Sequence, residues 1–188
     1  MLPKDKMPEA EVTLRLAIAL VVNRHVVNDV QVAIDGAQVK TGETIHFPIV
    51  EFLNSYGWHS LDQTPSWQTT YSNSNYPFSI VVHSNPGEGD LVADLKSGRT
   101  LRVESKKGPL LRSKSSQEYP LIREAIGQLI TIEHAAKSDL LAVAIPQSEK
   151  FDELANQWRD RPLMKSTGIH IVTVGRDNRI AGLESVGI

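Results

Sequence analysis

The sequence predicts an α/β fold, because helical and strand patterns alternate along a chain of 188 residues. Residues 45–56 and 115–137 carry apolar side chains at helical spacing, which indicates two helices that each bury one face. Residues 78–83 and 140–145 are short apolar runs of strand length. From residue 45 onward, the expected order is therefore helix, three strands, helix, strand, helix and a final pair of strands.

Local signals support these elements in turn. Pro48 lies in the first turn of the helix at 45–56, and Gly57 follows its last residue. Ser115 and Glu118 have the spacing of a capping box at the start of the long helix. A further helix is expected after Ser148, where apolar residues repeat at helical spacing. The last two strands, at 169–174 and 179–183, flank a turn at residues 177–178.

The first 44 residues form a separate part of the prediction. Residues 11–24 have a dense apolar stripe and predict a helix, and residues 30–34 alternate like a strand before a turn at Asp35-Gly36. We expect residues 1–44 to be an N-terminal accessory helix and hairpin, and residues 45–188 to be the core.

The most informative segment, residues 88–107, predicts a tight hairpin. Lys96-Ser97-Gly98 is a three-residue loop with glycine in its left-handed position, which sets Leu95 opposite Arg99. Counting outward along the two strands puts Asp90 opposite Glu104 and Glu88 opposite Lys106. The same register gathers the apolar residues on the other face, as a half-buried hairpin requires: Leu91, Ala93, Leu95, Leu101 and Val103.

The opposed acids predict a metal site. The β-carbons of directly opposed residues are about 4.5–5.5 Å apart, so two carboxylates there repel each other unless a cation lies between them. Hard oxygen ligands with open positions suit Mg²⁺ or Mn²⁺. Lys106 points to the same side as Glu104, where it can act on a water molecule or on charge that develops on a phosphate. Asp94 shares that face but is roughly 13 Å further along the strand, too far for the same metal.

These residues resemble the signature of the PD-(D/E)XK phosphodiesterase superfamily, the restriction-endonuclease-like nucleases. That signature is an acid at the start of one strand and an acid-x-Lys triplet on the next, which Asp90 and Glu104-Ser105-Lys106 supply. The resemblance implies an α-β-β-β-α-β core with a central mixed β-sheet flanked by helices. It also implies that Asp90, Glu104 and the Ser105 carbonyl hold the metal, while Lys106 serves the attacking water. The proline that usually precedes the first acid is replaced by Gly89.

Three more polar residues are candidates for this site. Gln128 lies on or beside the apolar stripe of the long helix, and in some branches of the resembled superfamily a glutamine on this helix supports the metal or its water. A boundary glutamine that reaches solvent is the alternative. Glu51, on the helix at 45–56, and Glu88 are possible additional acids, although Glu51 also fits an exposed helix position and Glu88 a simple ion pair with Lys106.

Charge and composition limit the choice of partner. The net charge is −2, so affinity for nucleic acid must come from a local patch. Residues 102–123 contain six basic and two acidic residues, and we expect Lys107, Arg112 and Lys114 to contact phosphates. The longest apolar run, residues 16–22, is too short to span a membrane. The sequence has no cysteine, which suits a reducing compartment such as the cytoplasm.

The sequence therefore predicts a nuclease that hydrolyses phosphodiester bonds, most simply in DNA, with Mg²⁺ or Mn²⁺. Cleavage of both strands would need two sites, hence a homodimer or two binding events. The alternative is a catalytically inactive module of the same fold that binds nucleic acid or a protein. Retention of Asp90, Glu104 and Lys106 favours the enzyme.

Overall fold

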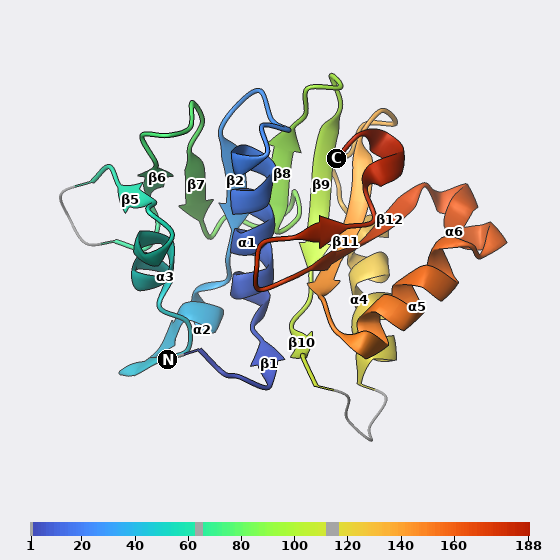
Figure 1. Ribbon diagram of the computed structural model, residues 1–188, viewed down its shortest axis with the longest axis horizontal. Helices are drawn as coiled ribbons and strands as arrows, with labels where there is room; N and C mark the ends of the chain where they lie inside the picture. The colour runs from blue at the N-terminus through green and yellow to red at the C-terminus, as the bar shows by residue number, and fades with distance from the viewer. Residues whose placement is uncertain (1, 63–65, 112–116) are drawn as a thin grey trace.

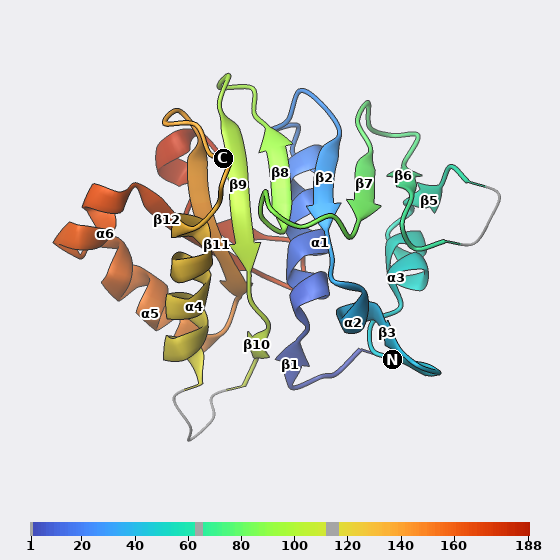
Figure 2. The ribbon, with the colours of Figure 1, turned by 180° about the vertical axis from the view of Figure 1, so that it is seen from behind.

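A mixed β-sheet runs through the whole molecule, with helices packed on both faces (Figures 1 and 2). The computed structural model describes residues 2–62, 66–111 and 117–188. Within these residues, nine strands follow the spatial order β13-β12-β11-β9-β8-β2-β7-β6-β5. These strands are, in chain order, β2 (Val30–Ala33), β5 (His59–Ser60), β6 (Thr70–Ser72), β7 (Ile80–His83), β8 (Leu91–Asp94), β9 (Thr100–Ser105), β11 (Leu140–Pro146), β12 (Ile169–Val174) and β13 (Ile180–Ala181).

Shorter strands and the helices complete the fold. Strands β1 (Lys6–Met7) and β10 (Gly108–Pro109) pair with each other, as do β3 (Lys40–Thr41) and β4 (Thr44–Ile45). The helices are α1 (Glu9–Val22), α2 (Gly36–Val39), α3 (Ile49–Ser55), α4 (Glu118–Ile130), α5 (Glu149–Arg159), α6 (Pro162–Thr167) and a 3-10 turn η1 (Glu184–Val186). None of the helices in the described ranges is long and apolar enough to cross a membrane. The predicted α/β class is confirmed.

The hairpin formed by β8 and β9 has the register that the sequence predicts. Leu91 pairs with Val103 and Asp94 with Thr100, and the amide of Leu95 donates to the carbonyl of Arg99 at 2.9 Å. Gly98 adopts a φ of 77°, the left-handed conformation that the loop requires. The expected apolar face is buried: Leu91, Ala93, Leu95, Leu101 and Val103.

Strand β2 lies in the middle of the sheet and α1 packs across it. Residues 1–44 are therefore part of the core rather than the accessory element that the sequence predicted. Strand β2 pairs antiparallel with β8 on one side and parallel with β7 on the other. Strands that follow one another along a chain usually pair, but here residues 34–90 separate β2 from its partner β8. Strand β7 therefore lies on the far side of β2, and side chains from both sides of residue 44, such as Leu20 and Leu101, share one hydrophobic core.

The two faces of the sheet are covered differently. Helix α1 packs across one face in Figure 1, whereas Figure 2 shows α4 on the opposite face over β9 and β11. On this second face, Ile122 of α4 and Phe151 of α5 share a core with Val143 and Ile171 of the strands. Over β8, β2 and β7, the same view shows no helix from the described residues. We call this face, which no helix of the described residues covers, the open face of the three strands, although the connection from β7 to β8 crosses it at the end of β2.

The helices on the second face agree only in part with the sequence prediction. Helix α4 ends at Ile130 rather than near residue 137. After it the chain turns toward β11, and Asp139, just before that strand, accepts a hydrogen bond from Arg102 at 2.7 Å. Ser115, the expected cap of this helix, lies outside the described residues. The helix expected after Ser148 is confirmed as α5, and the structure adds a cap, since the Ser148 hydroxyl accepts a hydrogen bond from the amide of Phe151. Strands β5 and β6 lie between the predicted helix at 45–56 and the predicted strand at 78–83, where the sequence predicted no element.

Candidate active site

The acid pair lies at one end of the central strands, where β9 ends and β8 begins. Asp90 immediately precedes β8, and its amide donates to the carbonyl of Val103 at 2.8 Å. In return, the amide of Ser105 donates to Oδ2 of Asp90 at 2.8 Å. These two bonds tie Asp90, through its amide and its carboxylate, to the backbone of the strand that carries Glu104. The hairpin thus holds the two acids side by side on the sheet face that α4 partly covers.

Gly89 explains why a proline is absent before the first acid. Its φ is 100°, a conformation that side-chain-bearing residues rarely adopt and that the ring of proline forbids. A β-carbon on Gly89 would lie 2.9 Å from the carbonyl oxygen of Val103. The close approach of the two strands at this point therefore requires glycine, and it is the same approach that brings Asp90 to Ser105.

Both carboxyl groups hold their protons more tightly than free acids do. Burial, reinforced by the charge of Glu104, raises the pKa of Asp90 to about 8, although the Ser105 amide and Lys106 oppose this rise. Burial also raises the pKa of Glu104 to about 6, against the opposing effect of Lys106 and with a further rise from Glu9. The site is therefore a desolvated pair of acids in which Asp90 keeps a proton at neutral pH, and a bound cation would favour the charged form of both carboxyl groups.

Lys106 is buried beside this pair and contacts two other acids. Its side chain is 6% exposed, and its Nζ lies 3.2 Å from Oε1 of Glu124 and 4.0 Å from Oε2 of Glu9. Glu88, the predicted ion-pair partner, instead contacts Arg102 at 3.2 Å. This correction follows from the end of the ladder, since the paired residues stop at Leu91 and Val103 and do not extend to Glu88.

Glu9 is the functional candidate that sequence reasoning missed. It is the first residue of α1, and it raises the pKa of both Asp90 and Glu104. Gln38 fixes it by donating to its Oε1 at 2.8 Å. Acids are common in the first turn of a helix because they interact favourably with the positive end of the helix dipole. The sequence around Glu9 therefore did not distinguish a site residue from an ordinary helix start.

The other predicted site residues that the structure describes are exposed, and they do not join the acid pair. Gln128 is exposed on α4, and Glu124, one turn earlier, is the residue of that helix that contacts Lys106. Glu51 is exposed on α3 and acts on Tyr71 of β6, so it belongs to the far side of the sheet. Lys107 is exposed directly after the triplet. Arg112 and Lys114 lie outside the described residues.

The acid pair offers two carboxylates, and the Ser105 carbonyl one further oxygen, to a divalent cation such as Mg²⁺ or Mn²⁺. Among the described residues, no three Asp, Glu, His or Cys side chains form a metal-binding group. Mg²⁺ does not require such a group, because it commonly binds one or two carboxylates and keeps waters or substrate phosphates as its other ligands. Asp90, Glu104 and the Ser105 carbonyl fit that requirement.

The raised pKa values predict an unusual dependence of stability on pH. Between about pH 4 and pH 8, folded Asp90 retains a proton that the unfolded chain releases. Because the folded state then binds more protons, the free energy of unfolding must fall as the pH rises through this window. In metal-free buffer, chemical unfolding of wild-type protein at pH 5.5 and pH 8.5 should show a loss that Asp90→Asn reduces by at least about 1 kcal/mol.

Asp94→Asn is the matched control for this measurement. Asp94 is exposed at the other end of β8, and hydrogen bonds from Asn28 and Thr100 lower its pKa. A lowered pKa contributes stability that is lost only as the pH falls through the acid range, so this variant should retain the wild-type slope between pH 5.5 and pH 8.5. An identical slope in the wild type and Asp90→Asn would show that Asp90 is not the group that titrates.

Comparison with known proteins adds no relative to this description: no family model, curated protein or solved structure matches the chain.

Proposed function

We propose that this protein is a metal-dependent nuclease that hydrolyses phosphodiester bonds, most simply in DNA. The observation that carries the proposal is the half-buried acid pair, Asp90 and Glu104, whose pKa values are raised by desolvation, with the buried ammonium group of Lys106 beside it. Placing two carboxylates together away from water is costly unless a bound cation compensates their charge. Carboxyl groups with strongly shifted pKa values, next to a buried lysine at the ends of neighbouring strands, are typical of a catalytic site.

The chain topology supports the same proposal. When residues 34–90 and the two-residue strands β1 and β10 are left out, the elements from α1 to β11 follow the order α1-β2-β8-β9-α4-β11. In this series β2, β8 and β9 pair antiparallel in succession, and β11 pairs parallel with β9. This order matches the α-β-β-β-α-β order expected of a restriction-endonuclease-like core, with α1 in place of α3 as the first helix. The match supports the same proposal as the acid pair.

Each residue has a chemical role in this proposal. Asp90, Glu104 and the Ser105 carbonyl hold the divalent ion, which when bound supplies Lewis-acid activation of water and of a phosphate oxygen. The ammonium group of Lys106 stabilises negative charge that develops on the phosphate or on the attacking water. Glu9 and Glu124 keep that ammonium group in place before substrate arrives. Lys107, which is exposed, contacts the phosphates of the flanking nucleotides.

Addition of Mg²⁺ or Mn²⁺ should stabilise the protein in the absence of substrate. A ligand that binds only the folded state, at a hundred times its dissociation constant, adds about 2.7 kcal/mol to the free energy of unfolding. The gain should be larger at pH 8.5 than at pH 6, because the ion must displace the proton of Asp90. Chemical unfolding with and without metal, supported by calorimetric titration, measures both effects.

Asp90→Asn should lose most of this stabilisation, and Asp94→Asn should retain it. Equal stabilisation of the wild type and Asp90→Asn would remove Asp90 from the metal site. The companion assay is cleavage of plasmid, linear and single-stranded DNA in the presence of Mg²⁺, which tests the activity itself.

A further inference from the structure

The open face of β8, β2 and β7 continues from the acid pair. Side chains on a strand alternate between faces, so Gln31 and Val92 lie on the same face as Asp90, opposite the face that packs on α1. Gln31 pairs with Val92 on one side and with Val81 on the other, and all three side chains are half-buried. Val92 is two residues from Asp90, or roughly 7 Å along the strand. A strand of substrate held at the acid pair would reach this face directly.

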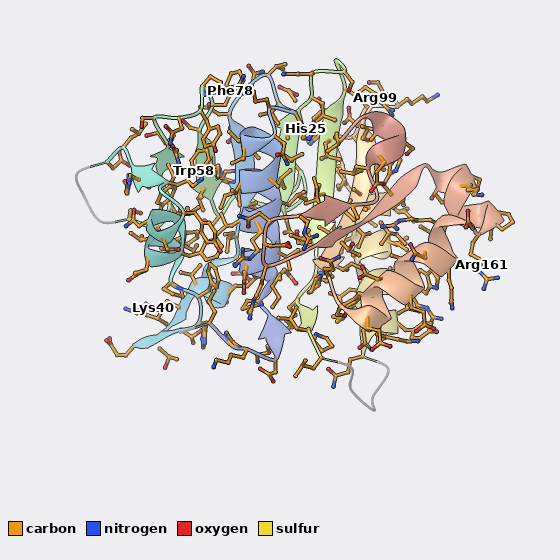
Figure 3. All side chains as sticks on the ribbon, in the orientation of Figure 1. His25, Lys40, Trp58, Phe78, Arg99 and Arg161 are labelled. Atoms are coloured by element: carbon orange, nitrogen blue, oxygen red, sulfur yellow. The ribbon has the colours of Figure 1, made fainter. Side chains whose placement is uncertain are left out.

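A cavity opens on this face. Its volume is about 520 Å³, within the range of sites that hold small organic groups. It extends from Gln31 and Val92 to the end of the strands at which β2 and β7 begin. Phe78, which is labelled at that end in Figure 3, is one of the lining residues. The lining residues are Asn28, Asp29, Gln31, Phe78, Val92 and Asp94.

The charges around this cavity exclude a phosphate as its occupant. Its lining contains two carboxylates, Asp29 and Asp94, and no lysine or arginine. The guanidinium group of Arg102, on the same face of β9, is already held by Asp139 at 2.7 Å and by Glu88 at 3.2 Å. The sugar-phosphate backbone of a duplex would therefore be repelled here, since nothing neutralises its charge.

The same lining suits a nucleobase. Phe78 packs partly against the hydrophobic core and borders the cavity with the rest of its side chain. It is the aromatic residue among those that line the cavity, and stacking on an aromatic ring tolerates any base. The side-chain amide of Gln31 makes no hydrogen bond to any described residue and can pair with the edge of a base through its donor and its acceptor. Asn28 is fixed next to it, because its Nδ2 donates to Oδ2 of Asp94 at 3.0 Å. Both carboxylates can accept hydrogen bonds from exocyclic amino groups.

We propose that this cavity binds an unpaired base of the strand that is cut, so that the preferred substrate has single-stranded nucleotides next to the cleaved phosphate. This inference rests on the proposed nuclease function. A paired base would not fit, because its edge is covered by its partner and because the second strand of the duplex would bring additional phosphates to an acidic surface.

The test uses the full chain and oligonucleotides that carry 2-aminopurine at one position at a time. Binding is measured by fluorescence in EDTA, and cleavage in Mg²⁺ is measured on single-stranded, duplex and flap substrates. Phe78→Leu keeps an apolar side chain but removes the stacking ring, and Gln31→Ala removes the amide. Both should weaken binding of single strands, Phe78→Leu by about tenfold or more. Gln157→Ala, an exposed glutamine on α5, is the matched control, and thermal melting checks that each variant is folded.

Three results decide the question. The proposal expects 2-aminopurine at one position to change its fluorescence on binding, this signal to be lost in Phe78→Leu, and single-stranded or flap substrates to be cleaved faster than duplex. Equal cleavage of duplex and single strands, with both variants like wild type, would overturn the base site while leaving the nuclease intact. A position-specific fluorescence signal without cleavage of any substrate would retain the base site and contradict the nuclease.

Discussion

Replacing Lys106 with alanine should lower the rate of cleavage at saturating substrate by about a hundred- to a thousandfold, which is the usual cost of losing one well-placed electrostatic contributor. The reason is that Lys106 acts on charge that develops during the reaction, and its side chain is held at the site by Glu9 and Glu124. The dissociation constant for DNA should change much less. Single-turnover kinetics with the wild type and Lys106→Ala in Mg²⁺ and in Mn²⁺ separates the two quantities.

Lys96→Ala is the control for this substitution. Lys96 is an exposed lysine in the turn between β8 and β9, at the opposite end of these two strands from Lys106. Its replacement should leave both the rate and the affinity unchanged. Vigorous metal-dependent cleavage by Lys106→Ala would leave a nuclease but refute the role given to this lysine.

Replacing Glu11 with alanine should lower the free energy of unfolding by about 3–5 kcal/mol, the typical cost of breaking a buried ion pair. Glu11 is fully buried, and its Oε1 accepts hydrogen bonds from Arg15 at 2.9 Å and from Arg176 at 3.0 Å. Arg15 is almost as buried and packs over the rings of Phe52 and Tyr56. Without Glu11, both guanidinium groups would lose their carboxylate partner.

Urea unfolding of Glu11→Ala measures this loss, and Glu133→Ala, an exposed glutamate after α4, is the matched control with an expected change near zero. A loss of less than about 1 kcal/mol in Glu11→Ala would show that the network contributes little to the folded state. The network also fixes the N-terminal segment, because Arg176 donates to the carbonyls of Pro3 and Lys6. Since residues two apart on a helix point in nearly opposite directions, anchoring Glu11 on one side of α1 orients Glu9 toward Lys106 on the other.

The hairpin shows what could be predicted from sequence. A three-residue loop ending in Gly98 and the alternation of apolar residues together fix the register of β8 and β9, because both are local properties of one short segment. That register brought Asp90 and Glu104 together without further information. Helix α5 was equally local, since the apolar spacing that predicts it lies within one short segment after Ser148.

The position of Glu9 shows what could not be predicted. It reaches the acid pair because β2 returns to the centre of the sheet and pairs with β8, across a separation of more than fifty residues. Local patterns do not encode such a pairing, and an intervening segment with its own helices and strands conceals it. The same effect placed Glu51 near β6 rather than at the site, because α3 is not the helix that covers β9.

The most direct test of the central claim is metal-dependent cleavage of DNA by the wild type and by Glu104→Gln, purified in parallel and assayed with Mg²⁺ and with EDTA. Glu104→Gln keeps the shape of the side chain and removes the charge that holds the ion. The account predicts that the wild type cleaves only with the metal present and that Glu104→Gln, although folded, does not cleave. Equal cleavage by both proteins, or no cleavage of any DNA or RNA substrate by folded wild type, would contradict it.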